Sequence, residues 1–351
     1  MKRVLLFLIL ISGMLSFGVA SAQETVEVQA TILNLIEETV EGGESKTIIE
    51  ARTDGGDSYV IDSSDAYTDL EPYALKEGDL VMLQVVMDAD GNETAYISDV
   101  VRTPMLLIIL LIFVGVTLLV GWLRGLLAMI GLAVTIAVLF LFILPQILAG
   151  GDPVIITVIG AAMILIVNMH LAHGFNKQTL MALLATLIGL ALVVAFAHLF
   201  VELARLTGLG SEEAALLSFT TVEIVSFKGL LLAGIILGAV GVLDDIAIAQ
   251  SETVAELREA NPELDDKELF RRAMRIGRHH IASTVNTLVL AYAGVAMPLF
   301  LLFLVTNEIE LARFLNEPII AEEIVRTLAG TTALVLTVPI ATWFATIAPR
   351  R

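Results

Sequence analysis

The chain has no cysteine among its 351 residues. This absence excludes a disulfide framework, a zinc–thiolate site and a thiol nucleophile. Sequence signatures of soluble enzymes are also lacking, since the chain has no G-x-S-x-G, no H-E-x-x-H and no phosphate-binding P-loop. We therefore expect no enzyme activity, no catalytic residue, no bound cofactor and no metal. Without an ATP site, any transport would have to draw on an ion gradient or a partner.

Charged residues are scarce, at 17%, whereas hydrophobic residues make up 57% and the mean hydropathy is +0.87. Such a composition is typical of a chain solvated by lipid. The negative charge is confined to one segment: residues 23–101 hold 19 acidic and three basic residues, a charge of −16 out of the formal −18. This acidity disfavours nucleic acid as a partner.

The N-terminus resembles a secretory signal peptide over residues 1–22. Lys2 and Arg3 precede an apolar stretch from Leu5 to Val19, and Ala20-Ser21-Ala22 matches an A-x-A cleavage site. An uncleaved anchor is the alternative reading. In either case the following segment is exported.

Residues 23–103 are predicted to form an exported, acidic β-domain. Five segments rich in Val, Ile, Thr and Tyr are separated by Gly- and Asp-rich turns, and a short helical insert is expected near Ala66–Leu75. Five strands with a helical insert between the third and the fourth favour a small barrel of OB type. Asp88, Asp90 and Asn92 fit a hairpin turn better than a calcium loop. The expected strands are 26–35, 46–52, 57–63, 79–87 and 93–101.

Residues 104–351 are predicted to form a polytopic α-helical bundle of seven spans. Apolar runs long enough to cross a bilayer cover residues 105–122, 125–148, 154–173, 179–202, 228–250, 281–305 and 325–347. Between spans, Asp265–Ile276 is expected to be a charged inner helix that ends at Gly277, and Asn307–Glu323 an outer amphipathic segment broken at Pro318.

Charge sets the expected orientation. With residue 104 outside, the inner connections and the C-terminus hold 10 Lys or Arg residues and the outer connections hold 4. The positive-inside rule therefore agrees with the signal peptide. The prediction is a bacterial cytoplasmic membrane protein with its β-domain outside and its C-terminus in the cytoplasm.

The span 228–250 carries the main candidate site. Gly234, Gly238, Gly241 and Asp245 share one helix face, which suits close helix packing and leads to the pair Asp244 and Asp245. Carboxylates at membrane depth are costly and usually face a bundle interior or a wet cavity. Two such neighbours should not both be ionised, and we expect Asp245 to be the more buried. A wetted helix end or a polar packing node are the alternatives.

Polar residues of other spans are expected at a similar depth. They are Asn168 and His170 at the inner end of span three, and Ser283, Thr284, Asn286 and Thr287 in span six. Ser283, Thr287, Ala291 and Gly294 form a second stripe of small or polar residues at helical spacing. The predicted proton or ion site comprises Asp244, Asp245, His170, Ser283, Asn286 and Thr287, with Gly294 added to the helix-packing glycines.

Two sequence resemblances follow from these motifs. Gly238–Glu252, then Asn261-Pro262, then Ile276–Gly294 resemble the YibE/F family of bacterial membrane proteins over nearly the whole chain. More distantly, Gly241-Val-Leu-Asp-Asp245 with the Thr/Asn-rich span is similar to RND permeases and to SecD/SecF, whose aspartates implicate proton flow. Spans two to seven would then equal one RND half, although no span interior holds the Lys that pairs with the RND aspartates.

The resemblance to RND permeases, together with the acidic pair, implies a secondary permease or an ion-gradient-coupled transducer, whereas the YibE/F resemblance implies no particular activity. The alternative is a non-transporting scaffold that presents the β-domain to an envelope partner. Because two-half permeases are common, we expect a homodimer or a complex with a second YibE/F-like chain, in contact with membrane lipid.

Overall fold

The computed structural model describes residues 25–39, 45–62, 75–87, 93–220, 226–305 and 310–348. By internal contacts it divides into two units, Met1–Val114 and Gly115–Arg351. The predicted signal peptide lies outside the described residues, as do Asp88, Asp90, Asn92 and nearly all of the helical insert expected near Ala66–Leu75.

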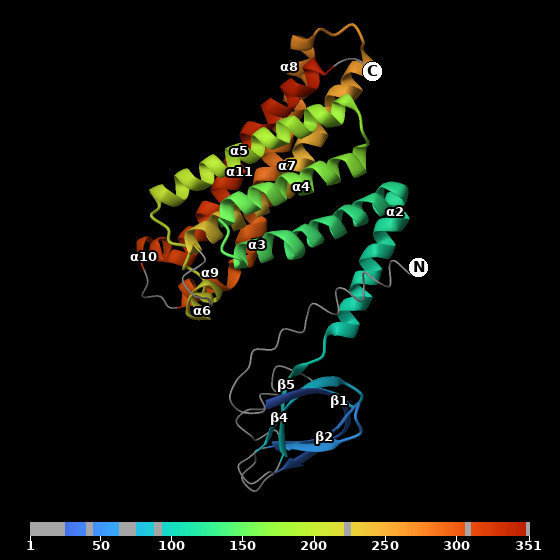
Figure 1. The fold of residues 1–351 in the computed structure, drawn as a ribbon, viewed down its shortest axis with the longest axis vertical. Helices are drawn as coiled ribbons and strands as arrows, with labels where there is room; N and C mark the ends of the chain where they lie inside the picture. Colours follow the sequence, from blue (N-terminus) through green and yellow to red (C-terminus); the bar gives the residue numbers. More distant parts are fainter. Residues whose placement is uncertain are drawn as a thin grey trace. The chain divides into compact units, whose positions relative to one another are not determined.

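The first unit contains an antiparallel sheet of five strands in the order β3-β2-β1-β4-β5 (Figure 1). Each strand lies within a few residues of its predicted position. Alternating side chains point into one small core, as in β4, where Val81, Leu83 and Val85 are buried and their neighbours are not. The strands are β1 (Thr25–Thr39), β2 (Ser45–Thr53), β3 (Ser58–Asp62), β4 (Leu80–Met87) and β5 (Glu93–Val100).

The sheet curves into a half-barrel whose two edge strands approach each other. The Tyr59 hydroxyl of β3 donates a hydrogen bond to Glu93 Oε2 of β5 over 2.9 Å. This bond to a carboxylate raises the pKa of the Tyr59 phenol, because loss of its proton would leave two facing anions. The core is lined by residues from all five strands: Ala30, Ile32, Ile49, Ala51, Ile61, Val81, Leu83, Val85, Ala95 and Ile97.

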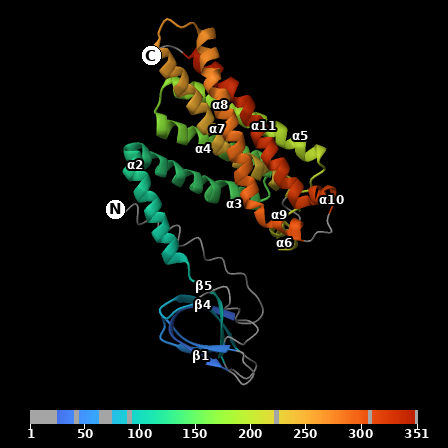
Figure 2. The ribbon, with the colours of Figure 1, turned by 180° about the vertical axis from the view of Figure 1, so that it is seen from behind.

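The rest of the described chain is helical (Figure 2). Asp152, Asn176 and Ser226 each cap the following helix by accepting backbone N–H groups. The elements are α2 (Thr103–Val138), the π-helical turn η1 (Leu139–Ile143), α3 (Leu144–Leu148), α4 (Pro153–His173), α5 (Lys177–Leu203), α6 (Glu212–Thr220), α7 (Phe227–Ala260), α8 (Asp266–Val295), α9 (Met297–Val305), α10 (Leu311–Asn316) and α11 (Pro318–Ile347).

Five of these helical stretches in the described chain are long and apolar enough to cross a membrane, or six if α8 and α9, bent by 61°, form one span. The expected spans 105–122 and 125–148 fall in one run, Thr103–Leu148. Trp122 breaks that run, because its φ of 51° and ψ of −132° are not helical. Gly125 follows at a position where a Cβ would collide with the Thr117 carbonyl, so the two sides of the break pack closely.

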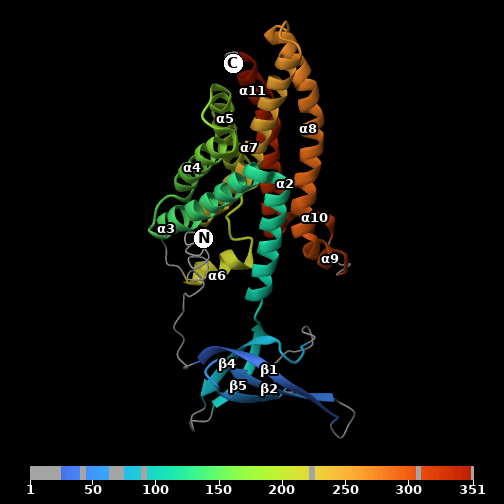
Figure 3. The same cartoon turned by 90° about the vertical axis from the view of Figure 1, so that its right-hand side faces the viewer.

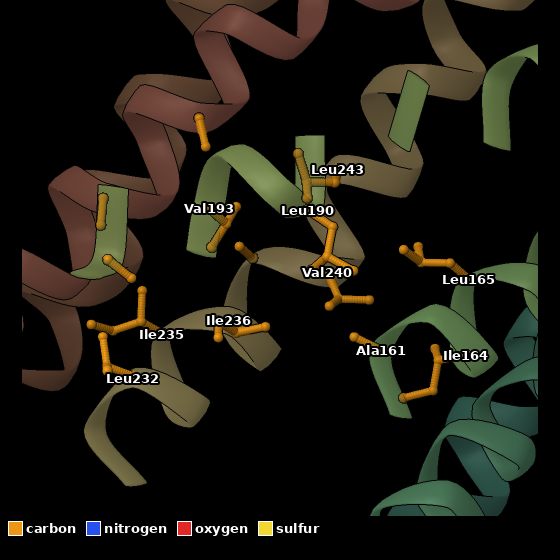
Figure 4. Packing of buried hydrophobic residues seen from close by; sticks show 14 of the residues in the cluster. Ala161, Ile164, Leu165, Leu190, Val193, Leu232, Ile235, Ile236, Val240 and Leu243 are labelled. Carbon is orange, nitrogen blue, oxygen red and sulfur yellow. The ribbon is translucent and has the colours of Figure 1, made fainter. Parts of the chain in front are cut away.

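The core of the helical unit forms around α7. Figure 4 shows Ile236, Val240 and Leu243 of α7 packed among Leu190 and Val193 of α5 and Ala161 and Leu165 of α4. Helix α11 packs against α5, α7 and α8. Figure 3 places α4 and α5 on one side of α7 and α11, and α8 on the other.

The prediction that Gly277 ends a helix is wrong. The helix begins where it was expected, with Asp265 as its cap, but α8 then runs without interruption to Val295. Gly277 is buried, and a Cβ there would lie 2.9 Å from Val338 Cγ1 of α11 and 3.0 Å from Gln250 Oε1 of α7. This glycine allows three helices to meet closely. At Pro318, by contrast, the predicted break is confirmed, since α10 ends at Asn316 and α11 begins at Pro318.

Candidate functional site

The acidic pair lies far along α7. Asp244 is 17 residues beyond Phe227, the first residue of α7, which is about 26 Å along an α-helix. A hydrocarbon core is about 30 Å thick, so the pair lies near one end of the crossing. Adjacent residues of a helix point about 100° apart, so the two carboxyls face different neighbours.

Asp244, not Asp245, is the more buried of the two. Asp245 is exposed, whereas Asp244 is partly buried and its Oδ1 has neither solvent access nor a hydrogen-bond partner. The expectation that Asp245 would be the buried member is wrong. Asp245 does continue the face of Gly238 and Gly241, but that face is itself exposed.

The side of α7 that carries Asp244 faces α4. Leu237, two turns before Asp244, packs against a cluster that includes Ile156 of α4. One turn after it, Ile248 lines a cavity of about 30 Å³ together with His173 of α4 and Thr179 of α5. Because α4 and α7 run in the same direction, residues four or five before His173 lie level with Asp244.

Asn168 occupies that level on α4. Its Nδ2 donates to Thr135 Oγ1 of α2 over 3.1 Å, while its Oδ1 is buried and has no donor. Asn168 Oδ1 and Asp244 Oδ1 are thus two buried acceptor oxygens without a hydrogen at the same depth on neighbouring helices. A buried acceptor without a donor is costly, so Asp244 favours an added proton, and both oxygens favour a hydrogen-bond donor or a cation.

His170 does not join this pair. Its Nδ1 lies 2.7 Å from the Ile166 carbonyl on its own helix, and its ring contacts Phe175 at a centroid distance of 4.5 Å. These contacts suit a histidine at the helix end.

The span-six residues share the depth of the pair but not its surroundings. A Cβ at Gly238 would lie 3.3 Å from Tyr292 Oη, and Gly277 approaches Gln250, so the antiparallel α7 and α8 place Asp245 level with residues 282–285. Ser283, Asn286 and Thr287 are nevertheless exposed, and the Thr287 hydroxyl donates to the Ser283 carbonyl of its own helix. The predicted site therefore does not assemble as one cluster.

The glycine stripe of α7 makes no tight helix crossing within the described chain. A Cβ at Gly241 or Gly294 would meet nothing within 4 Å, and at Gly234 or Gly238 it would meet only the ends of the flexible side chains Arg326 and Tyr292. Besides Gly277, a tight crossing lies at Gly189 of α5, where a Cβ would lie 2.6 Å from Thr337 Oγ1 of α11.

Two polar groups were missed from the sequence. Gln250 is buried and accepts a hydrogen bond of 2.9 Å from the Thr342 hydroxyl of α11. Threonines 327, 331, 342 and 346 recur on one side of α11, and this periodicity is the signal that could have identified the contact.

The second missed group lies at the other end of α11. Glu322 is buried and accepts the Gly210 N–H at 3.0 Å, while Glu323 pairs with Arg326 at 3.2 Å. Arg326, which the sequence placed at the outer edge of the last span, belongs to α11, and its guanidinium reaches Gly234 of α7.

Among the described residues, no group of three or more His, Asp or Glu side chains could hold a metal ion. Comparison with known proteins gives one family: a model described as YibE/F-like protein matches residues 109–351. No curated protein matches the chain. No solved structure matches it either.

Proposed function

The chain belongs to the YibE/F-like family, and we propose that it is a secondary permease or an ion-gradient-coupled transducer in which Asp244 takes up the coupling proton or cation. The observation that carries this proposal is the pair of buried, unpartnered oxygens, Asp244 Oδ1 and Asn168 Oδ1, at one depth on α7 and α4.

A proton or a small hard cation fits these oxygens better than other ligands do. A proton on Asp244 converts one acceptor into a donor, and Na⁺ or another hard cation takes carboxylate, amide and hydroxyl oxygens together. Thr135 Oγ1 of α2 is bonded to the Asn168 amide and supplies a further oxygen on the Asn168 side of the proposed site. Intramembrane carboxyls that face a bundle interior are characteristic of proton and ion pathways.

Access from one membrane face supports the proposal. The cavity below Ile248 contains His173 and Glu252, whose Nδ1 and Oε1 lie 4.0 Å apart. Glu252 lies two turns beyond Asp244 on α7, and His173 ends α4, the helix that carries Asn168, so the proposed route from water to Asp244 passes these two groups. Asp245, on the exposed side, has no role in this route and serves as the natural control.

The architecture that we propose has seven spans, with Thr103–Leu148 crossing twice through the break at Trp122 and α8 with α9 forming one bent crossing. Spans two to seven then correspond to one RND half. The half-barrel, whose strand order and Tyr59–Glu93 contact suit an OB-type domain, is exported behind a signal peptide. The membrane is a bacterial cytoplasmic membrane.

This topology predicts which positions an impermeant thiol reagent can reach. A single cysteine at position 266 should remain unlabelled in intact cells and react after permeabilisation, whereas one at position 54 in the β-domain should react in both. The chain has no native cysteine, so the background is zero. Labelling of position 266 in intact cells would contradict the orientation.

A second chain is proposed to cover the outer face of α8. Ser283 and Asn286 are exposed on α8, which we propose crosses the membrane, and exposed polar groups at that depth need a partner. We expect cysteines placed at positions 283 or 287 to cross-link between two copies in membranes, while a cysteine at position 166, on α4, does not. Absence of cross-linking at all three positions would oppose a homodimer through α8.

Proton flux in proteoliposomes tests the proposed function. Vesicles that contain the full chain and an internal pH dye should acidify or alkalinise after an imposed pH or Na⁺ gradient, at rates above protein-free vesicles. If the wild-type chain and empty vesicles respond alike under proton and Na⁺ gradients, the chain is better explained as the scaffold that displays its β-domain.

A further inference from the structure

A cavity of about 230 Å³ lies in the bend between α8 and α9, where both helices face the first turns of α11 (Figure 3). The two helices are bent by 61° at Ala296. The bend turns α9 away from the line of α8 and leaves a hollow beside α11. An apolar cavity of about 150 Å³ can hold a benzene molecule, so this one is large enough for a hydrocarbon ligand.

The walls of this cavity are mostly apolar. Ala296 and Ile320 form its floor, and their side chains are 5% and 3% exposed. Phe300 of α9 contributes another wall, and its ring contacts that of Phe314 of α10 at a centroid distance of 6.0 Å. The exposed side chains at the rim are Val289, Phe300, Ile324 and Leu328. Three helices therefore surround a hydrocarbon surface whose open rim is also apolar.

The polar groups that border the cavity are engaged elsewhere. Glu323 Oε1 accepts a hydrogen bond of 3.2 Å from Arg326 Nε, and the Thr327 hydroxyl donates to the Glu323 carbonyl over 2.8 Å. The Tyr292 hydroxyl extends toward α7, where a Cβ at Gly238 would lie 3.3 Å from Tyr292 Oη. Among the described residues that line the cavity, none is a cation and the one acid is paired. A charged ligand would therefore lose its hydration without replacement, whereas an apolar ligand has none to lose.

The shape of the cavity favours an extended ligand. Its lining runs from Ile320 to Leu328, which is about 12 Å along the axis of α11. Helix α11 is long and apolar enough to cross a membrane, and α8 with α9 is proposed above to form the neighbouring crossing. The long direction of the cavity then follows the direction of the lipid chains. An unfilled hollow at this place loses dispersion contacts, which a hydrocarbon chain would restore.

We propose that this cavity holds one acyl chain of a membrane phospholipid, inserted between α8–α9 and α11. The chain packs against Ala293 and Ala296 on one side and against Ile320 and Ile324 on the other. It is held by close packing, as neighbouring helices are in a membrane. The bound lipid thereby becomes part of the contact between the last two crossings. The proposal rests on these helices lying in the bilayer and does not depend on transport through Asp244.

Photo-cross-linking of the full chain tests the proposal. The protein is placed in phosphatidylcholine nanodiscs in which a small share of the phosphatidylcholine carries a diazirine in one acyl chain, and the labelled peptides are mapped by mass spectrometry. Labelling should be several-fold denser in residues 289–300 and 320–328 than in Met105–Ile112 of α2, whose apolar side chains are all exposed and do not line this cavity. Equal labelling of the three segments would indicate only surrounding lipid and would overturn the proposal.

Filling the cavity should remove the excess labelling. Ala293→Phe places a ring in the hollow, whereas Val295→Phe adds the same ring two residues away, at a side chain that is 80% exposed and outside the cavity. Ala293→Leu should give an intermediate loss, and it replaces Ala293→Phe where that variant does not fold. Equal labelling in the variants at positions 293 and 295 would contradict the proposal. A cysteine at position 293 that cross-links two copies in membranes would place a second chain in the cavity and would also overturn it.

Discussion

Replacement of Asp244 by asparagine is expected to lower gradient-driven flux by about 100-fold or more, the scale of a lost proton-transfer group. Asparagine keeps the shape of the side chain and removes its ability to exchange a proton or to neutralise a cation. The Asp244 oxygen is buried without a partner, so no neighbouring group can replace it. The measurement is the initial rate in proteoliposomes at matched protein content.

Asp245→Asn is the matched control, because it removes the same charge one residue away on the exposed side of α7. It should retain most of the flux. The flux of Asn168→Ala should lie between those of Asp244→Asn and Asp245→Asn, since this change removes the second unpartnered oxygen and the hydrogen bond to Thr135. A larger loss of flux in Asp245→Asn than in Asp244→Asn would show that the site lies on the side of α7 that faces α8.

The second large effect is expected at Gly189, where α5, α7 and α11 meet. A Cβ there would lie 2.6 Å from Thr337 Oγ1 and 3.0 Å from Leu243 Cδ2. Thr337 is fully buried and its hydroxyl is bonded to the Ala333 carbonyl, so it has little room to move. Gly189→Ala should lower the free energy of unfolding by about 1–3 kcal/mol through overpacking, and Gly189→Val should lower it further.

Gly241→Ala provides the comparison on a neighbouring helix. A Cβ at Gly241 meets nothing within 4 Å, so this change should be neutral or slightly stabilising because alanine favours helix. The unfolding midpoints of both variants are measured by heating in detergent, followed by the fluorescence of Trp122 and Trp343. Equal midpoints for Gly189→Ala and Gly241→Ala would show that the α5–α11 crossing is looser than described.

Much of the secondary structure could be predicted from the sequence because it depends on local patterns. Segments rich in Val, Ile, Thr and Tyr between Gly- and Asp-rich turns placed β4 and its neighbours, and long apolar runs located the helices. The charged segment after Asn261-Pro262 located the start of α8. The break at Trp122 was expected only as a gap between two runs. A backbone conformation with positive φ at a tryptophan depends on packing around it, here between Gly125 and Thr117, and no local signal encodes that contact.

The depth of the candidate site was predictable, but its orientation was not. Counting residues along α7 places Asp244 and Asp245 near one end of the span. Which of them is buried depends on which helices pack on each side of α7. A glycine stripe indicates close approach without naming the partner, so it could not show that the face of Asp245 is open within one chain. Gly277 was misread for the same reason, since a glycine that allows close packing and one that ends a helix look alike in sequence.

Labelling with a hydrophobic carbodiimide, which modifies protonated carboxyl groups in apolar surroundings, tests the central assignment of Asp244 most directly. The full chain in native membranes is treated, digested and mapped by mass spectrometry. The account predicts modification at Asp244 and little at Asp245, with less modification as the pH rises or, for a Na⁺-coupled chain, as Na⁺ is added. Modification confined to Asp245, or no modification of Asp244 at any pH, would contradict it.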